Sequence, residues 1–297
     1  MRRTTSIAAG IGATGAAVLG WSSLVEPRWF ALRRITIPVL VRGAWPIRIL
    51  HLSDLHIVPG QRVKTAWVSS LAALHPDLVV NTGDTLSHRE SVPAAVAAFG
   101  DLLDTPGAFV MGNNDYLAPI FKLPHHHFLG GTPRRARTPL PWGDLAAAQR
   151  ERGWHDLDNA KRTVTVRGQR IALAGVDDPY TDKDRYDTIA GAADDDAVVR
   201  IGVMHAPEPR ILDRFADDGY DLLLAGHTHG GQIRLPGFGA FTTNCSIDRS
   251  RARGLSRWGA HSLLHVSGGL GHSPFMPFRL CCRPEATLIT LVPRAEE

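Results

Sequence analysis

Apolar runs of strand length alternate with segments of helical spacing from about residue 42 onward. Residues 47–54 and 77–84 have the composition of buried strands, and residues 63–74 carry apolar side chains at helical spacing. A second helix is predicted over residues 93–103, and a third strand over residues 107–115. Repeated strand–helix units of this kind indicate a mixed β-sheet that is covered by helices.

The second half of the chain has more strand-like runs and no internal repeat. A long loop rich in Pro, Gly, His and Arg is predicted between residues 116 and 142. Further strands are predicted over residues 162–166, 170–178, 198–205, 220–227, 261–269 and 285–292. The pattern therefore predicts a single α/β domain over residues 41–297.

The first forty residues form a separate N-terminal segment in this prediction. A basic start, "MRR", precedes an uncharged stretch over residues 4–25, and charge returns in "EPRWFALRR". This order is typical of a signal-like segment, and we expect an uncleaved, weakly hydrophobic membrane anchor over residues 1–40. An amphipathic or disordered tail is the alternative. Basic residues flank both sides of the stretch, so the side of the membrane stays open.

Composition and charge exclude two classes of protein. Hydrophobic residues make up 44% of the 297 positions and charged residues 21%, which argues against global disorder. The net charge of +4 is too even for a dedicated nucleic-acid binder, so no nucleic-acid partner is expected. We interpret the basic clusters "PRRAR" (133–137) and "DRSRARG" (248–254) as solvated loops, with a secondary role in guiding an anionic substrate. The three cysteines are interpreted as small buried residues.

Polar side chains follow five of the predicted strands, at the point where each strand ends. Because the functional crevice of an open α/β sheet lies beyond the carboxyl ends of its strands, we expect these side chains to converge. They are Asp54 and His56, then Asp84, then Asn113, Asn114 and Asp115, then His205, and finally His227 and His229.

The residue types in these clusters point to metal binding. Asp, Asn and His offer oxygen and nitrogen ligands without thiolate, a set that suits manganese, iron or zinc. Asp84 has two carboxylate oxygens with which to bridge two ions, and His227 and His229 would point to the same side of an extended segment. Each motif alone is more often structural, but their conjunction at strand ends favours a site with two divalent metal ions. The triplet His125–His127 is interpreted as a solvated loop.

The ordered set of motifs, ending in "AGHTHGGQ", resembles the calcineurin-like metallophosphoesterases, and in particular their bacterial membrane-associated or exported branch. The resemblance covers about residues 45–292. It implies a four-layer α/β/β/α sandwich with two mixed β-sheets. It also implies two ligand sets that share one carboxylate: Asp54, His56, Asp84 and His229 for one metal, and Asp84, Asn113, His205 and His227 for the other.

One position departs from the family pattern. The third motif usually reads Gly-Asn-His-Asp, and its histidine is assigned to the leaving group or the transition state, whereas this chain has Asn114. An amide donates a hydrogen bond but does not act as a proton donor. We expect Asn114, held by Asp115, to hydrogen-bond to the substrate.

The resemblance implies a metal-dependent phosphohydrolase. A hydroxide activated by the dinuclear centre would cleave a phosphoester or pyrophosphate bond, with a phosphorylated small molecule or a lipid-linked, cell-envelope compound as substrate. The alternative is a membrane-anchored metal-binding module with little turnover, which Asn114 keeps open. A nuclease is a third option, and the modest net charge argues against it.

Overall fold

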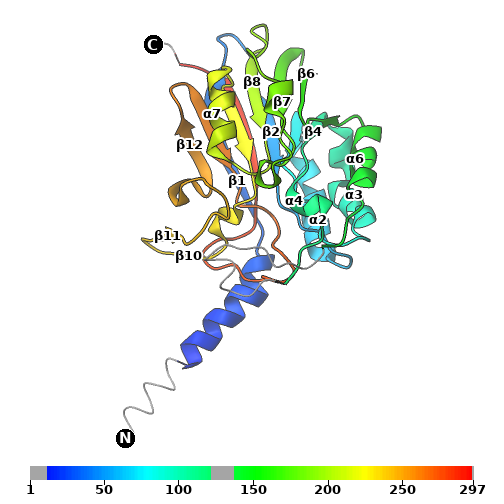
Figure 1. Cartoon of the computed structure of the whole chain (residues 1–297), viewed down its shortest axis with the longest axis vertical. Coiled ribbons are helices and arrows are strands. Elements are labelled where there is room, and N and C mark those ends of the chain that lie inside the picture. Colours follow the sequence, from blue (N-terminus) through cyan, green and yellow to red (C-terminus); the bar gives the residue numbers. More distant parts are fainter. Residues whose placement is uncertain (1–11, 122–136, 296–297) are drawn as a thin grey trace, which may run out of the picture.

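The computed structural model describes residues 12–121 and 137–295. Arg2, Arg3 and the histidine triplet His125–His127 lie outside the described residues. The described chain folds into two six-stranded β-sheets that pack face to face, with helices on the outer face of each (Figure 1).

The first sheet combines the N-terminal strands with the last strand of the chain. Its strands stand in the order β1-β14-β2-β3-β4-β5, with β14 antiparallel to β2 and every other neighbouring pair parallel. The strands are β1 (Ala31–Leu40), β14 (Glu285–Pro293), β2 (Ile47–Leu52), β3 (Leu78–Asn81), β4 (Gly107–Phe109) and β5 (His155–Asp156).

The second sheet is built from the second half of the chain. Its order is β12-β13-β9-β8-β7-β6, with antiparallel pairs at both edges and parallel pairs between them. The strands are β12 (Gly254–Trp258), β13 (Ser262–Val266), β9 (Leu222–Ala225), β8 (Val199–Val203), β7 (Gln169–Gly175) and β6 (Ala160–Val166). A small hairpin joins β10 (Arg234–Leu235) to β11 (Gly239–Ala240).

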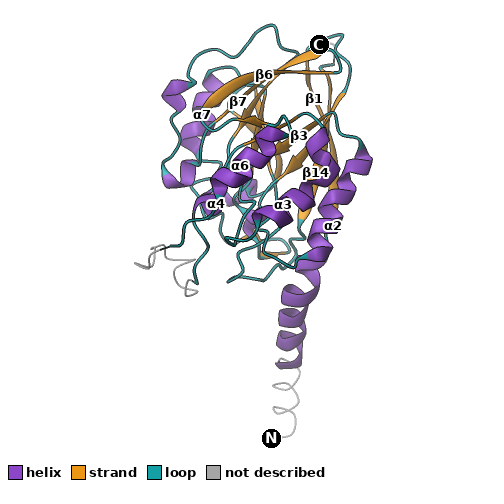
Figure 2. Cartoon of the chain, turned by 90° about the vertical axis from the view of Figure 1, so that its right-hand side faces the viewer, coloured by secondary structure: helices purple, strands orange, loops and turns teal. Residues whose placement is uncertain are grey.

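Helices cover the outer faces of the two sheets (Figure 2). Helices α2, α3 and α6 pack on the first sheet, and α7 packs on the second. The helices are α2 (Arg62–Ser70), α3 (Val92–Phe99), α4 (Asn113–Tyr116), α6 (Trp142–Glu151) and α7 (Pro209–Asp217). Both sheets are mixed, so the predicted four-layer α/β/β/α sandwich is confirmed.

Three hydrophobic clusters correspond to the three interfaces between layers. The middle cluster lies between the sheets and joins Ile49 and Val80 of the first to Ile201 and Leu224 of the second. The outer clusters fill the spaces under the helices. Because strands buried on both faces are largely apolar, β9 is a continuous hydrophobic run in the sequence, and β3 is one as far as Asn81.

The N-terminal segment is tied to the domain from Ser22 onward, since the Ser22 carbonyl accepts a hydrogen bond from the backbone of Arg279. Residues 12–20 are helical, and a short turn with a buried Glu26 leads into β1. The Glu26 carboxylate accepts hydrogen bonds from the backbone N–H groups of Cys281 and Cys282. Since β1 pairs with β14 along its length, residues 31–40 belong to the sheet, and we place the boundary of a removable segment near residue 20.

The membrane anchor predicted for this segment gains no support from the described helices. Within residues 12–121 and 137–295, every helix is too short or too polar to cross a lipid bilayer.

Several elements differ from the sequence predictions. The strand predicted over residues 107–115 ends at Phe109, and Asn113 begins the short helix α4 instead. The pattern also missed β1, α6, α7 and β12. Only Cys282 of the three cysteines is buried, since Cys281 is exposed and Cys245 is partly exposed. Strand β1 was missed because the exposed Arg33 and Arg34 interrupt its apolar residues, as in an edge strand that pairs on one side.

Candidate metal centre

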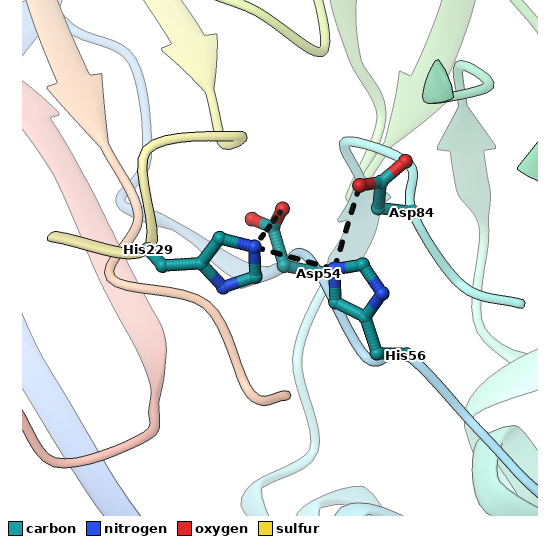
Figure 3. A group of neighbouring side chains, drawn as sticks. All are labelled: Asp54, His56, Asp84 and His229. Carbon is teal, nitrogen blue, oxygen red and sulfur yellow. Dashed lines mark hydrogen bonds and ion pairs between the residues drawn. The ribbon is translucent and has the colours of Figure 1, made fainter. Parts of the chain in front are cut away.

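Four of the predicted ligands converge at the ends of their strands. Oxygen or nitrogen atoms of Asp54, His56, Asp84 and His229 all lie within 4.8 Å of one another, and all four side chains are buried (Figure 3). Three separate segments supply them: the loops after β2, β3 and β9. The convergence that was predicted from the strand ends is therefore present for this group.

The spacing within the cluster is that of ligands around one ion. The Nε2 atoms of His56 and His229 lie 3.2 Å apart. The Nε2 atom of His56 is 3.4 Å from an oxygen of Asp84, and that of His229 is 3.6 Å from an oxygen of Asp54. Nitrogen ligands about 2.0–2.1 Å from a shared ion lie roughly 3.0–3.4 Å apart.

A second group of predicted ligands adjoins the first on the other side of Asp84. The Nε2 atom of His205 lies 3.5 Å from Asp84 Oδ2 and 3.1 Å from Nδ1 of His227. The Oδ1 atom of Asn113 is buried and has no hydrogen-bond partner within the described ranges. Asp84 thus stands between two groups of donors, as expected for a carboxylate shared by two ions.

Each histidine is oriented by a bond through its other ring nitrogen. Nδ1 of His56 lies 2.9 Å from Ser87 Oγ, Nδ1 of His205 lies 2.7 Å from the Thr82 carbonyl, and Nδ1 of His229 lies 3.1 Å from the Gly271 carbonyl. These contacts leave Nε2 facing the cluster. His227 is reversed: its Nε2 lies 3.3 Å from the Asn244 carbonyl and its Nδ1 faces inward. Such partners fix the tautomer and the ring plane of metal-binding histidines.

The backbone at these positions is also unusual. Asp54, His56, Asp84, His227 and His229 all have left-handed φ angles, between 45° and 67°. Non-glycine residues adopt this conformation rarely, and such residues concentrate at functional sites. Five of the seven candidate ligands therefore sit on backbone that local sequence preferences do not favour.

The backbone of the "GHTH" segment, which follows β9, differs from the prediction. The segment is not extended, because both of its histidines have left-handed φ angles and a 3-10 turn begins at His229. The rings consequently diverge, with His229 stacked on His56 and His227 edge-on to His205. The expectation of an extended segment was therefore wrong, but both rings present a nitrogen atom to the cluster, His229 toward His56 and His227 toward His205.

Glycine is required where β9 meets the cluster. A Cβ atom on Gly226 would lie 1.9 Å from Ser53 Oγ and 2.7 Å from Asp54 Oδ2. We expect Gly226→Ala to destabilise the protein by about 1–3 kcal/mol through overpacking and to lower its metal content by displacing Asp54. Urea denaturation and elemental analysis would measure both effects.

Gly143→Ala is the matched control, since a Cβ atom there, in α6, meets nothing within 4 Å. Equal stability of the two alanine variants would contradict the close approach at Gly226.

Burial has the largest influence on the titrating groups of the cluster. It raises the pKa of Asp54 to about 6 and that of Asp115 to about 7, and it lowers the pKa of His56 to about 3. Burial would also raise the pKa of Asp84, but the adjacent His205 ring holds that pKa well below its usual range. Asp84 in turn overcomes burial and raises the pKa of His205. Crowded buried carboxylates need compensating positive charge.

The donor set fits a pair of divalent cations. It has oxygen and nitrogen donors without thiolate, which suits manganese, iron or zinc. A cation would also satisfy the free Oδ1 atom of Asn113 and the buried carboxylates of Asp54 and Asp84.

Asn114 is held by different neighbours from those predicted. Its backbone N–H donates to Asp84 Oδ1 at 2.7 Å, and its side-chain amide donates to Asp84 Oδ2 at 2.7 Å. Asp115 instead accepts hydrogen bonds from the backbone N–H groups of Gly112 and Leu86. The expectation that Asp115 holds Asn114 was therefore wrong: Asp115 fixes the loop, and Asp84 fixes the amide.

Arg137 is a residue of the site that the sequence interpretation missed. Its guanidinium donates to the Asn114 side-chain oxygen at 2.9 Å and to the Leu117 carbonyl at 2.7 Å. It belongs to the basic cluster that we interpreted as a solvated loop, so its charge was visible in the sequence but its position was not. Tyr180, whose ring centre lies 4.6 Å from that of His227, was missed as well.

A comparison with known families identifies the family of the chain. The chain matches the model of the calcineurin-like phosphoesterases over residues 47–231, which is more than half its length and includes all seven candidate ligands. The chain belongs to the calcineurin-like phosphoesterase family. As a calcineurin-like phosphoesterase it is a phosphate-ester hydrolase of a family that uses divalent metals, which argues against a binding module without turnover.

Individual relatives of this calcineurin-like phosphoesterase align along most of their length. It is 28% identical to "Phosphodiesterase YaeI" of Escherichia coli (strain K12), over 92% of each chain. It is 29% identical to the "Uncharacterized protein YpbG" of Bacillus subtilis (strain 168), over 95% of this chain and 96% of the relative. It is 25% identical to "UDP-2,3-diacylglucosamine pyrophosphatase LpxG" of Chlamydia trachomatis, over 91% of each chain.

Proposed function

We propose that this protein hydrolyses phosphodiester or pyrophosphate bonds with the help of two divalent cations, on a lipid-linked or cell-envelope substrate. The observation that carries the proposal is the double donor group around Asp84. Asp54, His56, Asp84 and His229 would hold one cation, and Asp84, Asn113, His205 and His227 the other. When bound, the cations would supply an activated water molecule and neutralise charge on the phosphoryl oxygens.

Residues of the chain itself would orient the substrate. The Asn114 amide faces Asp84 between the two donor groups, where it would donate a hydrogen bond to a phosphoryl oxygen. Arg137 fixes that amide through its oxygen and brings a guanidinium, which binds phosphate well, to the edge of the site. Two relatives whose names describe a phosphodiesterase and a pyrophosphatase support the choice of bond.

An exposed apolar patch supports the lipid-linked class of substrate. A shallow, open depression of the surface is lined by Trp21, Leu24, Val25, Arg28 and Trp29 of the N-terminal segment. Leu24 is 64% exposed and Trp29 50% exposed. Apolar side chains gathered in this way, next to an arginine, are suited to contact an acyl chain or the surface of a membrane. The helix leaves the domain at the end that carries β10 and β11 (Figure 1).

Turnover of bis(p-nitrophenyl) phosphate tests the proposed reaction. We expect hydrolysis by the manganese-loaded protein, loss of activity on treatment with a chelator, and recovery when Mn²⁺ is restored. His205→Ala should lower the rate by at least about 100-fold, because even partners of metal ligands cost 10–100-fold when removed. His261→Ala, at an exposed histidine far from the cluster in sequence, is the control. Chelator-resistant turnover would disprove the proposal.

The N-terminal segment can be tested separately. Deletion of residues 1–20 should leave a metal-loaded, active domain, since the deletion keeps Glu26, β1 and every candidate ligand. We expect the full chain to partition with membranes more strongly than the deleted chain, and fractionation followed by assay would measure this. Equal partitioning of both chains would contradict a membrane role for the segment.

A further inference from the structure

A cavity of about 340 Å³ lies where the N-terminal segment meets the start of α2. Three segments form its walls: the end of the N-terminal helical segment with Arg28, the start of α2 from Gly60 to Lys64, and the loop that carries His272 and Pro277. None of the candidate metal ligands lines it. The cavity is therefore distinct from the proposed reaction centre.

The cavity is strongly cationic. Arg28, Arg62 and Lys64 line it together with His272, and none of its lining residues is an Asp or Glu. Among the described residues, Arg28 donates only to the backbone carbonyls of Ser23 and Leu24. The Arg62 side chain has no hydrogen bond or ion pair to any residue in the described ranges.

Lys64 adds a cation that is buried without a carboxylate. Its side chain is almost fully enclosed, and Nζ donates to the Leu55 carbonyl at 2.7 Å and lies 3.5 Å from the His56 carbonyl. A buried charge that lacks an opposite charge is costly, so an anion brought by a ligand would stabilise this arrangement.

The cavity and the metal centre share the same two loops. Lys64 contacts the backbone of Leu55 and His56, and His56 is a candidate metal ligand. His272 follows Gly271, whose carbonyl oxygen lies 3.1 Å from Nδ1 of His229. The cavity and the metal centre are therefore connected through these two loops.

We infer that this cavity binds a phosphoryl group, and that its occupant is the second phosphoryl group of the substrate. Two guanidinium groups and an ammonium match the charge and the several acceptor oxygens of a phosphoryl group better than those of a single carboxylate. The inference rests on the proposed function for the identity of the occupant, because the neighbouring centre is proposed to cleave phosphate esters. It favours a pyrophosphate-linked substrate over a simple monoester.

Substitution of the exposed arginines tests the inference without touching the metal ligands. We expect Arg62→Ala and Arg28→Ala to raise KM for a nucleoside diphosphate sugar by about 10- to 100-fold, the loss typical of a charge-assisted hydrogen bond. KM and kcat for bis(p-nitrophenyl) phosphate, which has no second phosphoryl group, should stay within about two-fold of wild type. Arg257→Ala, at an exposed arginine on β12 outside the cavity, is the matched control and should change neither.

Titration of the metal-loaded full chain with inorganic phosphate gives a readout that does not depend on turnover. Calorimetry should show one phosphate fewer per chain in the Arg28→Ala/Arg62→Ala double variant than in wild type. If the double variant binds one phosphate fewer but its KM for both substrates is unchanged, the cavity binds free phosphate, and the inference that it holds the second phosphoryl group of the substrate is overturned. The same stoichiometry in both proteins, together with unchanged or equally raised KM values, would overturn the inference. If wild type cleaves neither substrate, the proposed function fails, and the stoichiometry still decides the cavity.

Discussion

Asp84→Ala is expected to lose both metal ions and essentially all activity. Asp84 Oδ2 lies 3.4 Å from His56 Nε2 and 3.5 Å from His205 Nε2, so one carboxylate serves both donor groups. Its loss should exceed the 10- to 100-fold reduction in metal affinity or activity that is typical of removing a partner of a ligand. Elemental analysis of the purified protein and turnover of an aryl phosphodiester would measure the two losses.

The backbone at this position calls for a second variant. Because Asp84 has a φ angle of 53°, alanine there adds strain of about 1–2 kcal/mol that is unrelated to the metal. Asn tolerates this conformation better, so Asp84→Asn separates the missing charge from the strained backbone. Asp77→Asn is the control, since Asp77 Oδ2 accepts a hydrogen bond from the backbone of Arg48, outside the cluster. Full metal content in Asp84→Asn would disprove the bridging role.

Hydrolysis by the wild-type protein is expected to slow steeply as the leaving group becomes more basic. Asn114 stands where the family usually has a histidine, and neither its amide nor the Arg137 guanidinium releases a proton at neutral pH. A general acid typically contributes 10²–10⁴-fold. We therefore expect aryl esters and pyrophosphates to be cleaved well and simple alkyl esters poorly, which rates across a series of leaving groups would measure.

Substitution at Asn114 would separate hydrogen bonding from proton transfer. Asn114→His should flatten the dependence on leaving-group pKa by restoring a proton donor, while Asn114→Ala should lower all rates without changing the slope. His272 is a candidate for a substitute general acid. It lines the neighbouring cavity, however, and its Nδ1 lies 3.0 Å from the Ser273 carbonyl. A shallow slope in wild type would show that another group supplies the proton.

The sequence predicted the layers of the fold and the position of the cluster better than it predicted the orientation of individual side chains. Strands such as β3 and β9 were predictable because they are buried on both faces and therefore largely apolar. The polar residues of the cluster were also predictable, because they stand out in the sequence directly after such apolar strands. The direction of His227 and His229 was not predictable, because it depends on left-handed backbone that only the packing of the surrounding loops imposes.

Arg137 shows a second limit of the sequence. Its contacts to Asn114 and Leu117 span about twenty residues, and nothing in a run of basic residues tells which one folds back. The cationic cavity is a similar case, since Arg28 comes from a segment that we had assigned to a membrane anchor, and Lys64 from an ordinary helix. Sites assembled from distant residues with common side chains leave no motif.

The left-handed backbone at five candidate ligands also bears on how this site would decay. At such positions a histidine is strained by roughly 1–2 kcal/mol relative to glycine, so in a lineage released from selection for metal binding an exchange of His56 or His229 for glycine would relieve that backbone strain. Degenerate descendants of this protein should then be recognisable by glycines at the former ligand positions, on an otherwise unchanged sandwich. Directed evolution for higher thermal stability would also select glycine at these positions unless activity is selected at every round.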